Sequence, residues 1–127
     1  MKKSILKISV IMLLCITTIF CTACFDLTPP AEESFELVGE ISGDVEYVSY
    51  LGYSCELSGI LRNKSNYSYS YVSIEFSLYD ADGNNLGTAL ASVNNIGPGE
   101  TWRFTATLLS YPSTEPVSYK VANIYGW

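Results

Sequence analysis

The stretch YSYVSIEFSLY, residues 69–79, decides the fold class because its side chains alternate in character along its whole length. In an extended strand, successive side chains point to opposite faces of the sheet. One set is apolar and consists of Val72, Ile74, Phe76 and Leu78. The other set begins just before the stretch and consists of Tyr67, Tyr69, Tyr71, Ser73, Glu75, Ser77 and Tyr79. The pattern predicts a strand with one face in a core and the other in water or half covered.

Similar alternation recurs on both sides of this strand. From residue 35 onward, short segments rich in Val, Ile, Tyr, Phe and Thr are separated by Gly, Asn, Asp and Pro, and no helical period is sustained. The predicted strands cover residues 35–41, 44–51, 55–62, 69–79, 86–93, 101–109 and 117–125. Short strands separated by turn residues at this spacing predict an all-β sandwich.

The segment at residues 101–109 predicts the second wall of the core. Its inward set is Trp102, Phe104, Ala106 and Leu108, and its outward set is Arg103, Thr105 and Thr107. We expect Phe76 and Trp102 to lie buried on facing or adjacent strands. Loops rich in Gly and Pro flank this segment at residues 94–99 and 111–116.

Several of these segments together resemble the FxLYD domain, a family of small extracellular modules of bacteria and archaea. The resemblance covers residues 55–110 approximately, and Phe76, Leu78, Tyr79 and Asp80 stand at the positions that name the family. The remaining matching segments are residues 59–63, 71–75, 82–83, 86–87 and 96–104. The resemblance implies an immunoglobulin-like antiparallel β-sandwich of about seven strands on secreted or lipid-anchored proteins, and it implies no established activity.

The segment DADGNN, residues 80–85, places Asp80, Asp82 and Asn84 at alternate positions, as at the start of a calcium-binding loop. A helix–loop–helix calcium loop also needs glycine at its sixth position and a bidentate acid at its twelfth. Counted from Asp80, these positions hold Asn85 and Ala91, and no helix is predicted on either side. The favoured interpretation is a hairpin turn in which Asp80 accepts hydrogen bonds from the turn's own amides.

The N-terminus is typical of a bacterial lipoprotein precursor. Three lysines in residues 1–7 precede an apolar run at residues 8–20, which is shorter than the ~20 residues that span a bilayer. Small residues then precede Cys24, which resembles the cysteine that becomes acylated in lipoproteins. We therefore expect a signal peptide at residues 1–23, a lipidated Cys24 with a flexible tether at residues 24–34, and the β domain at residues 35–127. Ordinary secretion with cleavage nearby is the alternative.

The residue inventory restricts the chemistry of the exported chain. The thirteen acidic residues all follow Cys24, whereas three of the seven basic residues precede it, so the processed chain would be strongly acidic. Such a charge repels nucleic acid and anionic surfaces. The chain has no histidine, and we find no catalytic constellation, phosphate loop or set of metal ligands. Glu75 and Asp80 are predicted to face opposite ways. The protein is therefore predicted to be a non-enzyme without a cofactor.

Cys55 is the second cysteine that would remain after processing, so no disulfide within the exported chain is expected. It alternates with polar residues in the segment that also contains Leu57 and Leu61. A lone cysteine on the apolar side of a strand is usually a small core residue, and no histidine is present to activate it.

The tyrosines leave two classes of function open. Tyr67, Tyr69 and Tyr71 would form an aromatic face for a surface protein or a cell-wall polymer if they are exposed together. Alternatively they cover an outer sheet face, with Glu75 and Arg62 paired across neighbouring strands. The first interpretation predicts a membrane-anchored binding or adaptor module, and the second a structural spacer or accessory lipoprotein. A calcium-dependent adhesion module at Asp80, Asp82 and Asn84 is a third, less favoured hypothesis.

Overall fold

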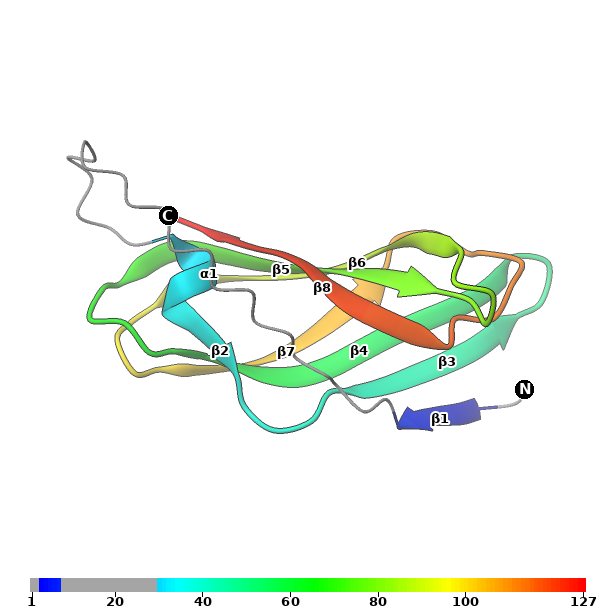
Figure 1. Ribbon diagram of the computed structural model, residues 1–127, viewed down its shortest axis with the longest axis horizontal. Coiled ribbons are helices and arrows are strands. Elements are labelled where there is room, and N and C mark those ends of the chain that lie inside the picture. Colours follow the sequence, from blue (N-terminus) through cyan, green and yellow to red (C-terminus); the bar gives the residue numbers. More distant parts are fainter. Residues whose placement is uncertain (1–2, 8–29) are drawn as a thin grey trace.

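The computed structural model describes residues 3–7 and 30–127. Within them the chain is an antiparallel β structure with one short helix (Figure 1). The elements are β1 Lys3–Lys7, α1 Ala31–Ser34, β2 Phe35–Leu37, β3 Ser42–Val48, β4 Gly52–Asn63, β5 Tyr69–Tyr79, β6 Asn85–Ile96, β7 Thr101–Leu108 and β8 Ser118–Gly126. This confirms the predicted all-β class.

The seven predicted strands correspond one to one with β2–β8, and β5 has the predicted bounds. Two elements were not predicted. β1 lies within the segment interpreted as an export signal and pairs antiparallel with β3. α1 lies in the predicted tether, where its single turn buries Ala31 and Ser34. Cys24 lies outside the described residues, so its lipidation stays a prediction.

The strands follow the order β1-β3-β4-β7-β6-β5-β8, and β2 pairs with β4 beside β3. β4 has long pairings with β3 and β7, and β5 has long pairings with β6 and β8. The link between these groups is narrow, because β6 and β7 share only the pairs Ala89–Leu108 and Leu90–Thr107. The sheet bends over at this link, so that side chains of β5 and β7 meet in the interior.

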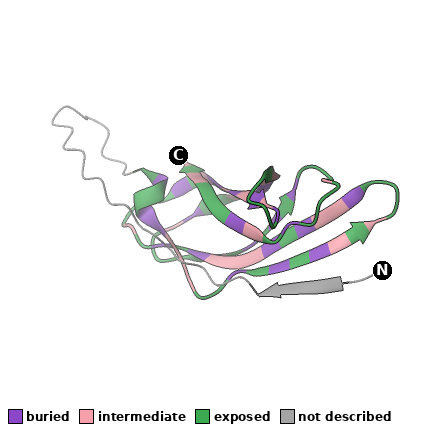
Figure 2. Ribbon diagram, turned by 45° about the vertical axis from the view of Figure 1, so that its right-hand side comes forward, coloured by how far each residue is buried: buried purple, intermediate pink, exposed green. Residues whose placement is uncertain are grey.

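The core lies between these two groups of strands. The rings of Phe76 on β5 and Phe104 on β7 are stacked with centroids 5.7 Å apart, and Tyr119 on β8 packs edge-on against Phe76 at 5.7 Å. Burying a Phe side chain contributes about 1.5–3 kcal/mol to folding. The predicted inward set of β5 is buried throughout: Val72, Ile74, Phe76 and Leu78. Figure 2 shows buried and exposed residues alternating along the strands.

Trp102 is less buried than predicted. Phe104, Ala106 and Leu108 are buried, but Trp102 is only half-buried and packs against Phe104 with centroids 5.7 Å apart. It is the second residue of β7, close to the point where the strand begins. The indole therefore covers the rim of the core.

Candidate functional site

The prediction that Tyr67, Tyr69 and Tyr71 lie together on one exposed face is wrong. Tyr69 is 1% exposed, its ring meets Phe35 at 5.2 Å, and its hydroxyl donates to Ser34 Oγ at 2.7 Å. Its partner on β6 is Ile96, which is also buried. The alternation of buried and exposed side chains along β6 changes at Asn95, where φ is 56°. This local conformation and the cover from α1 and β2 turn Tyr69 into a core residue.

The remaining two tyrosines of that set are separated. Tyr67 is 40% exposed in the loop before β5, where its carbonyl accepts a hydrogen bond from Asn63 Nδ2 at 2.7 Å. Tyr71 instead stacks on Trp127, with centroids 4.7 Å apart, and Trp127 meets Tyr125 edge-on at 5.3 Å. We call Tyr71, Tyr125 and Trp127 the aromatic row. The strand predicted from the sequence ended at residue 125, so Trp127 was not predicted to belong to this group. The two-residue spacing of Tyr125 and Trp127, which places both on one face of a strand, was the signal that could have found it.

A second exposed group lies at the opposite end of the molecule, around the turn between β3 and β4 (Figure 1). We call it the tip cluster; it comprises the exposed side chains of Tyr47, Tyr50, Leu51 and Tyr111 and the half-buried side chain of Tyr53. Tyr47 and Tyr53 pack edge-on at 5.2 Å, and Tyr53 N–H donates to the Pro112 carbonyl at 2.9 Å. A Cβ on Gly52 would lie 2.7 Å from the Tyr111 carbonyl oxygen and 2.5 Å from that of Pro112. Glycine at position 52 therefore lets the loop before β8 dock on the hairpin.

Tyr50 is the most unusual residue of the tip cluster. Its side chain is fully exposed, and its backbone has φ 71°, which non-glycine residues rarely adopt. A left-handed conformation costs an ordinary residue roughly 1–2 kcal/mol, and Asn or Gly would pay less. Tyr50 thus carries backbone strain and buries nothing in return. Local strain of this kind clusters at functional sites.

The segment Asp80–Asn84 forms the predicted hairpin turn. Asp80 Oδ1 accepts the amide N–H groups of Asp82 and Asn84, each at 2.9 Å, and Oδ2 accepts Asn84 Nδ2 at 3.1 Å. These bonds, first of all the one from the Asn84 backbone amide, lower the pKa of the Asp80 carboxyl. Gly83 has φ 81° and donates its N–H to the Asp80 carbonyl at 3.1 Å. Within residues 30–127, no group of three His, Cys, Asp or Glu side chains is arranged to hold a metal ion.

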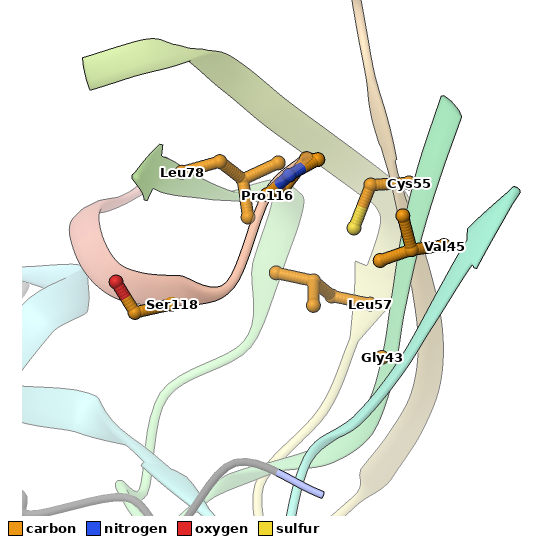
Figure 3. A pocket seen from close by; sticks show the side chains of 7 residues that line it. All are labelled: Gly43, Val45, Cys55, Leu57, Leu78, Pro116 and Ser118. Atoms are coloured by element: carbon orange, nitrogen blue, oxygen red, sulfur yellow. The ribbon is translucent and has the colours of Figure 1, made fainter. Parts of the chain in front are cut away.

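Cys55 is buried, as the alternation predicted, and its burial raises the pKa of the thiol to about 11. It lines a small gap where β3 and the start of β8 approach without pairing (Figure 3). The gap has about 190 Å³ of empty space, including open solvent, and is too narrow for a water molecule. Its walls are almost wholly apolar and are formed by Gly43, Val45, Cys55, Leu57, Leu78, Pro116 and Ser118. A protonated thiol in such a gap is a packing residue.

The predicted pair of Glu75 and Arg62 is also wrong. Arg62 on β4 forms an ion pair with Glu36 on β2, and its Nε donates to the same carboxylate at 2.9 Å. The hydrogen bond from Arg62 lowers the pKa of Glu36. Arg62 and Glu36 are directly opposite in the register, whereas Glu75 lies on β5 in the other group of strands. The pair is solvent-exposed, so it contributes little to stability.

Comparisons of the chain with protein families, curated proteins and solved structures gave no match. The resemblance to the FxLYD domain therefore stays a prediction. In the part of the chain that the structure describes, no helix has the length and apolar character needed to cross a membrane.

Proposed function

We propose that this protein is an exported lipoprotein, anchored to the bacterial cell membrane through Cys24, whose β domain is a binding or adaptor module for a surface protein or cell-wall partner. The observation that carries the proposal is the tip cluster, with the strained and fully exposed Tyr50 at its apex. Aromatic side chains are enriched at protein interfaces and often anchor them. A protein partner suits this apolar cluster best.

The position of the tip cluster supports this arrangement. The first described residues of the domain, in α1, lie next to the C-terminal end of β8, and the β3–β4 turn lies at the far end of the molecule (Figure 1). Two acyl chains on Cys24 would hold the α1 end near the bilayer, because each buried methylene contributes ~0.8 kcal/mol. The tip cluster would then point away from the membrane, where it can meet a partner.

We also propose that the domain is an immunoglobulin-like β-sandwich of the FxLYD type. The stacked rings of Phe76 and Phe104 between two groups of strands, and the narrow β6–β7 link, support two packed sheets. Catalysis is no part of the proposal: the Asp80 carboxylate is engaged in its turn, the Glu36 carboxylate in an ion pair, and the Cys55 thiol in packing.

Site-specific photo-crosslinking in intact cells tests the binding function. A photoreactive residue at position 50 should give one discrete protein adduct, and this adduct should be lost when Leu51→Ser or Tyr111→Ser is added. Position 125 is the matched control, because Tyr125 is also an exposed tyrosine but lies at the other end of the domain. Equal adducts from both positions, or none from position 50, would overturn the proposal.

The anchor has a separate test. Cys24→Ala should release the protein from the membrane fraction or leave it as an uncleaved precursor, because the diacyl anchor is lost. Metabolic labelling with a fatty acid provides the measurement. Equal labelling of Cys24→Ala and the unmodified protein would refute the assignment.

A spacer or accessory lipoprotein without its own ligand is the second candidate. The burial of Tyr69 favours it, since an aromatic face at Tyr67, Tyr69 and Tyr71 would have supported binding directly. Under this alternative the photoreactive residue at position 50 gives no partner-specific adduct, so the same crosslinking experiment separates the two functions.

A further inference from the structure

We propose that the outer face of β8, β5 and β6, at the end near α1, binds an uncharged glycan chain built of equatorially substituted pyranoses. The binding platform is the aromatic row. This site is separate from the tip cluster and depends neither on a protein partner there nor on the lipid anchor.

The aromatic row is fixed in place by main-chain pairing. Trp127 N–H donates to the Tyr71 carbonyl at 3.1 Å, and Tyr71 N–H donates to the Trp127 carbonyl at 3.3 Å. The two residues are therefore direct cross-strand neighbours, and their rings stack with an interplanar angle of 25°. Tyr125 lies two residues earlier on the same face of β8 and touches Trp127 edge-on. The three rings are thus organised before any ligand arrives.

Cross-strand packing does not account for the exposure of the aromatic row. Trp127 is 59% exposed and Tyr125 is 52% exposed, although each already contacts another ring. Rings that serve only to cover a sheet would be largely buried against it. The open surfaces of Tyr125 and Trp127 are available to a ligand.

The residues beside the aromatic row are small and polar. The register places Ser73 opposite Tyr125, Asn94 opposite Tyr71, and Ser92 opposite Ser73. Ser92 and Asn94 are exposed, whereas Ser73 is buried, so the first two supply the accessible polar groups. One step further along β5, Glu75 pairs with Asn123 and is the first charged residue on this face. Amide and hydroxyl groups around a set of rings are what a sugar chain needs, because its hydroxyl groups require partners.

The chemistry of this face favours a neutral glycan over two other occupants. An equatorially substituted pyranose presents a flat face of C–H groups, which packs on the electron-rich face of an aromatic ring. The core of a protein interface is more apolar than its rim; the tip cluster includes the exposed aliphatic side chain of Leu51, whereas small polar residues adjoin the aromatic row. An anionic polymer would meet an acidic protein, with four basic and thirteen acidic residues after Cys24.

Tryptophan fluorescence of the protein purified from membranes, in a detergent without a sugar headgroup, tests the proposal. The chain has two tryptophans, so Trp102→Phe leaves Trp127 as the reporter. Titration with a β-1,4-linked tetramer of N-acetylglucosamine should give a saturable change in emission. Tyr125→Ser should weaken binding at least about ten-fold without changing the melting temperature, and Asn94→Ala should weaken it several-fold.

Tyr111→Ser is the matched control, because Tyr111 has nearly the same exposure as Tyr125 but lies in the tip cluster. It should leave the titration unchanged. Absence of a saturable change at about 10 mM tetramer, where weak ligands with millimolar affinity still bind, would overturn the proposal. So would equal affinity of the Tyr125→Ser variant. A Trp127 signal that follows protein concentration instead of the tetramer would replace the glycan with a second copy of the chain.

Discussion

Two hairpin turns lie at the same end of the molecule and are built in opposite ways. The turn at Asp80–Asn84 uses glycine where φ is positive and directs the Asp80 carboxylate at the turn's own amides. The turn between β3 and β4 places Tyr50 at φ 71° and leaves its ring in solvent. The first turn has glycine at its positive-φ position, which agrees with local conformational preference. The second turn has a tyrosine at such a position, which conflicts with that preference. Departures from local rules are expected where a protein retains a residue for function.

The largest effect should come from the core that both turns share. Phe76→Ala removes a ring that contacts both Phe104 and Tyr119, and it should lower the free energy of unfolding by about 3–5 kcal/mol. Chemical denaturation provides the measurement. Trp102→Ala is the companion variant and should cost less, since the indole is only half-buried. If Trp102→Ala lowers the free energy of unfolding more than Phe76→Ala does, the contacts of Phe76 with Phe104 and Tyr119 are not the centre of the core. The two turns would then not share that core.

The next largest loss of stability should come from a substitution in the Asp80 turn, and the size of this loss should depend on pH. Asp80→Ala removes the acceptor of three hydrogen bonds and should lower the melting temperature at pH 7. Because the pKa of Asp80 is lowered in the fold, its stabilisation is complete above the unfolded pKa of about 3.9 and disappears as the pH falls through the folded pKa. The difference between the two proteins should therefore shrink below about pH 4. A difference that is constant down to pH 2 would contradict this account.

A pair of substitutions compares the two positive-φ positions directly. Gly83→Ala puts a side chain at φ 81° in open space and should cost about 1 kcal/mol. Tyr50→Asn introduces, at φ 71°, a residue that tolerates positive φ, and it should raise the free energy of unfolding by about 0.5–1 kcal/mol. Thermal denaturation measures both. If Tyr50→Asn destabilises the domain, then Tyr50 has a structural role and the contrast between the turns fails.

The smallest expected effect is that of calcium. Calcium at millimolar concentration should leave the melting temperature unchanged, because a ligand stabilises only when it binds the native state and the Asp80 oxygens already accept turn hydrogen bonds. Asp82→Ala serves as the control. A calcium-dependent rise that is lost in Asp82→Ala would make the Asp80 turn a metal site and restore the calcium-dependent adhesion hypothesis.

The sequence was most informative where one local signal decides the structure. The alternation of residues 69–79 predicted the bounds of β5 and the burial of its four apolar residues Val72, Ile74, Phe76 and Leu78, and Asp-Gly predicted the turn after it. The burial of Tyr69 was not predictable in this way, because it depends on α1 and β2, which are distant in sequence.

The partners of Arg62 and Tyr71 were missed for a related reason. Strand alternation gives the face on which a side chain lies, but it does not give the neighbouring strand. Arg62 forms an ion pair with Glu36 on the neighbouring β2, and Tyr71 stacks on Trp127, the residue just beyond β8. The tip cluster was missed because the strand prediction extended through Tyr50, where the observed backbone turns.

The long pairing of β3 with β4 has a mechanical consequence. A pull between the α1 end of the domain and a partner held at the β3–β4 turn would act nearly parallel to these strands (Figure 1). Under such shear, the seven residue pairs from Ser42–Ser58 to Val48–Gly52 must yield almost together instead of opening one after another. The domain would then resist tension far better along this axis than across it, as the proposed anchor at Cys24 and the proposed partner at the tip cluster would require.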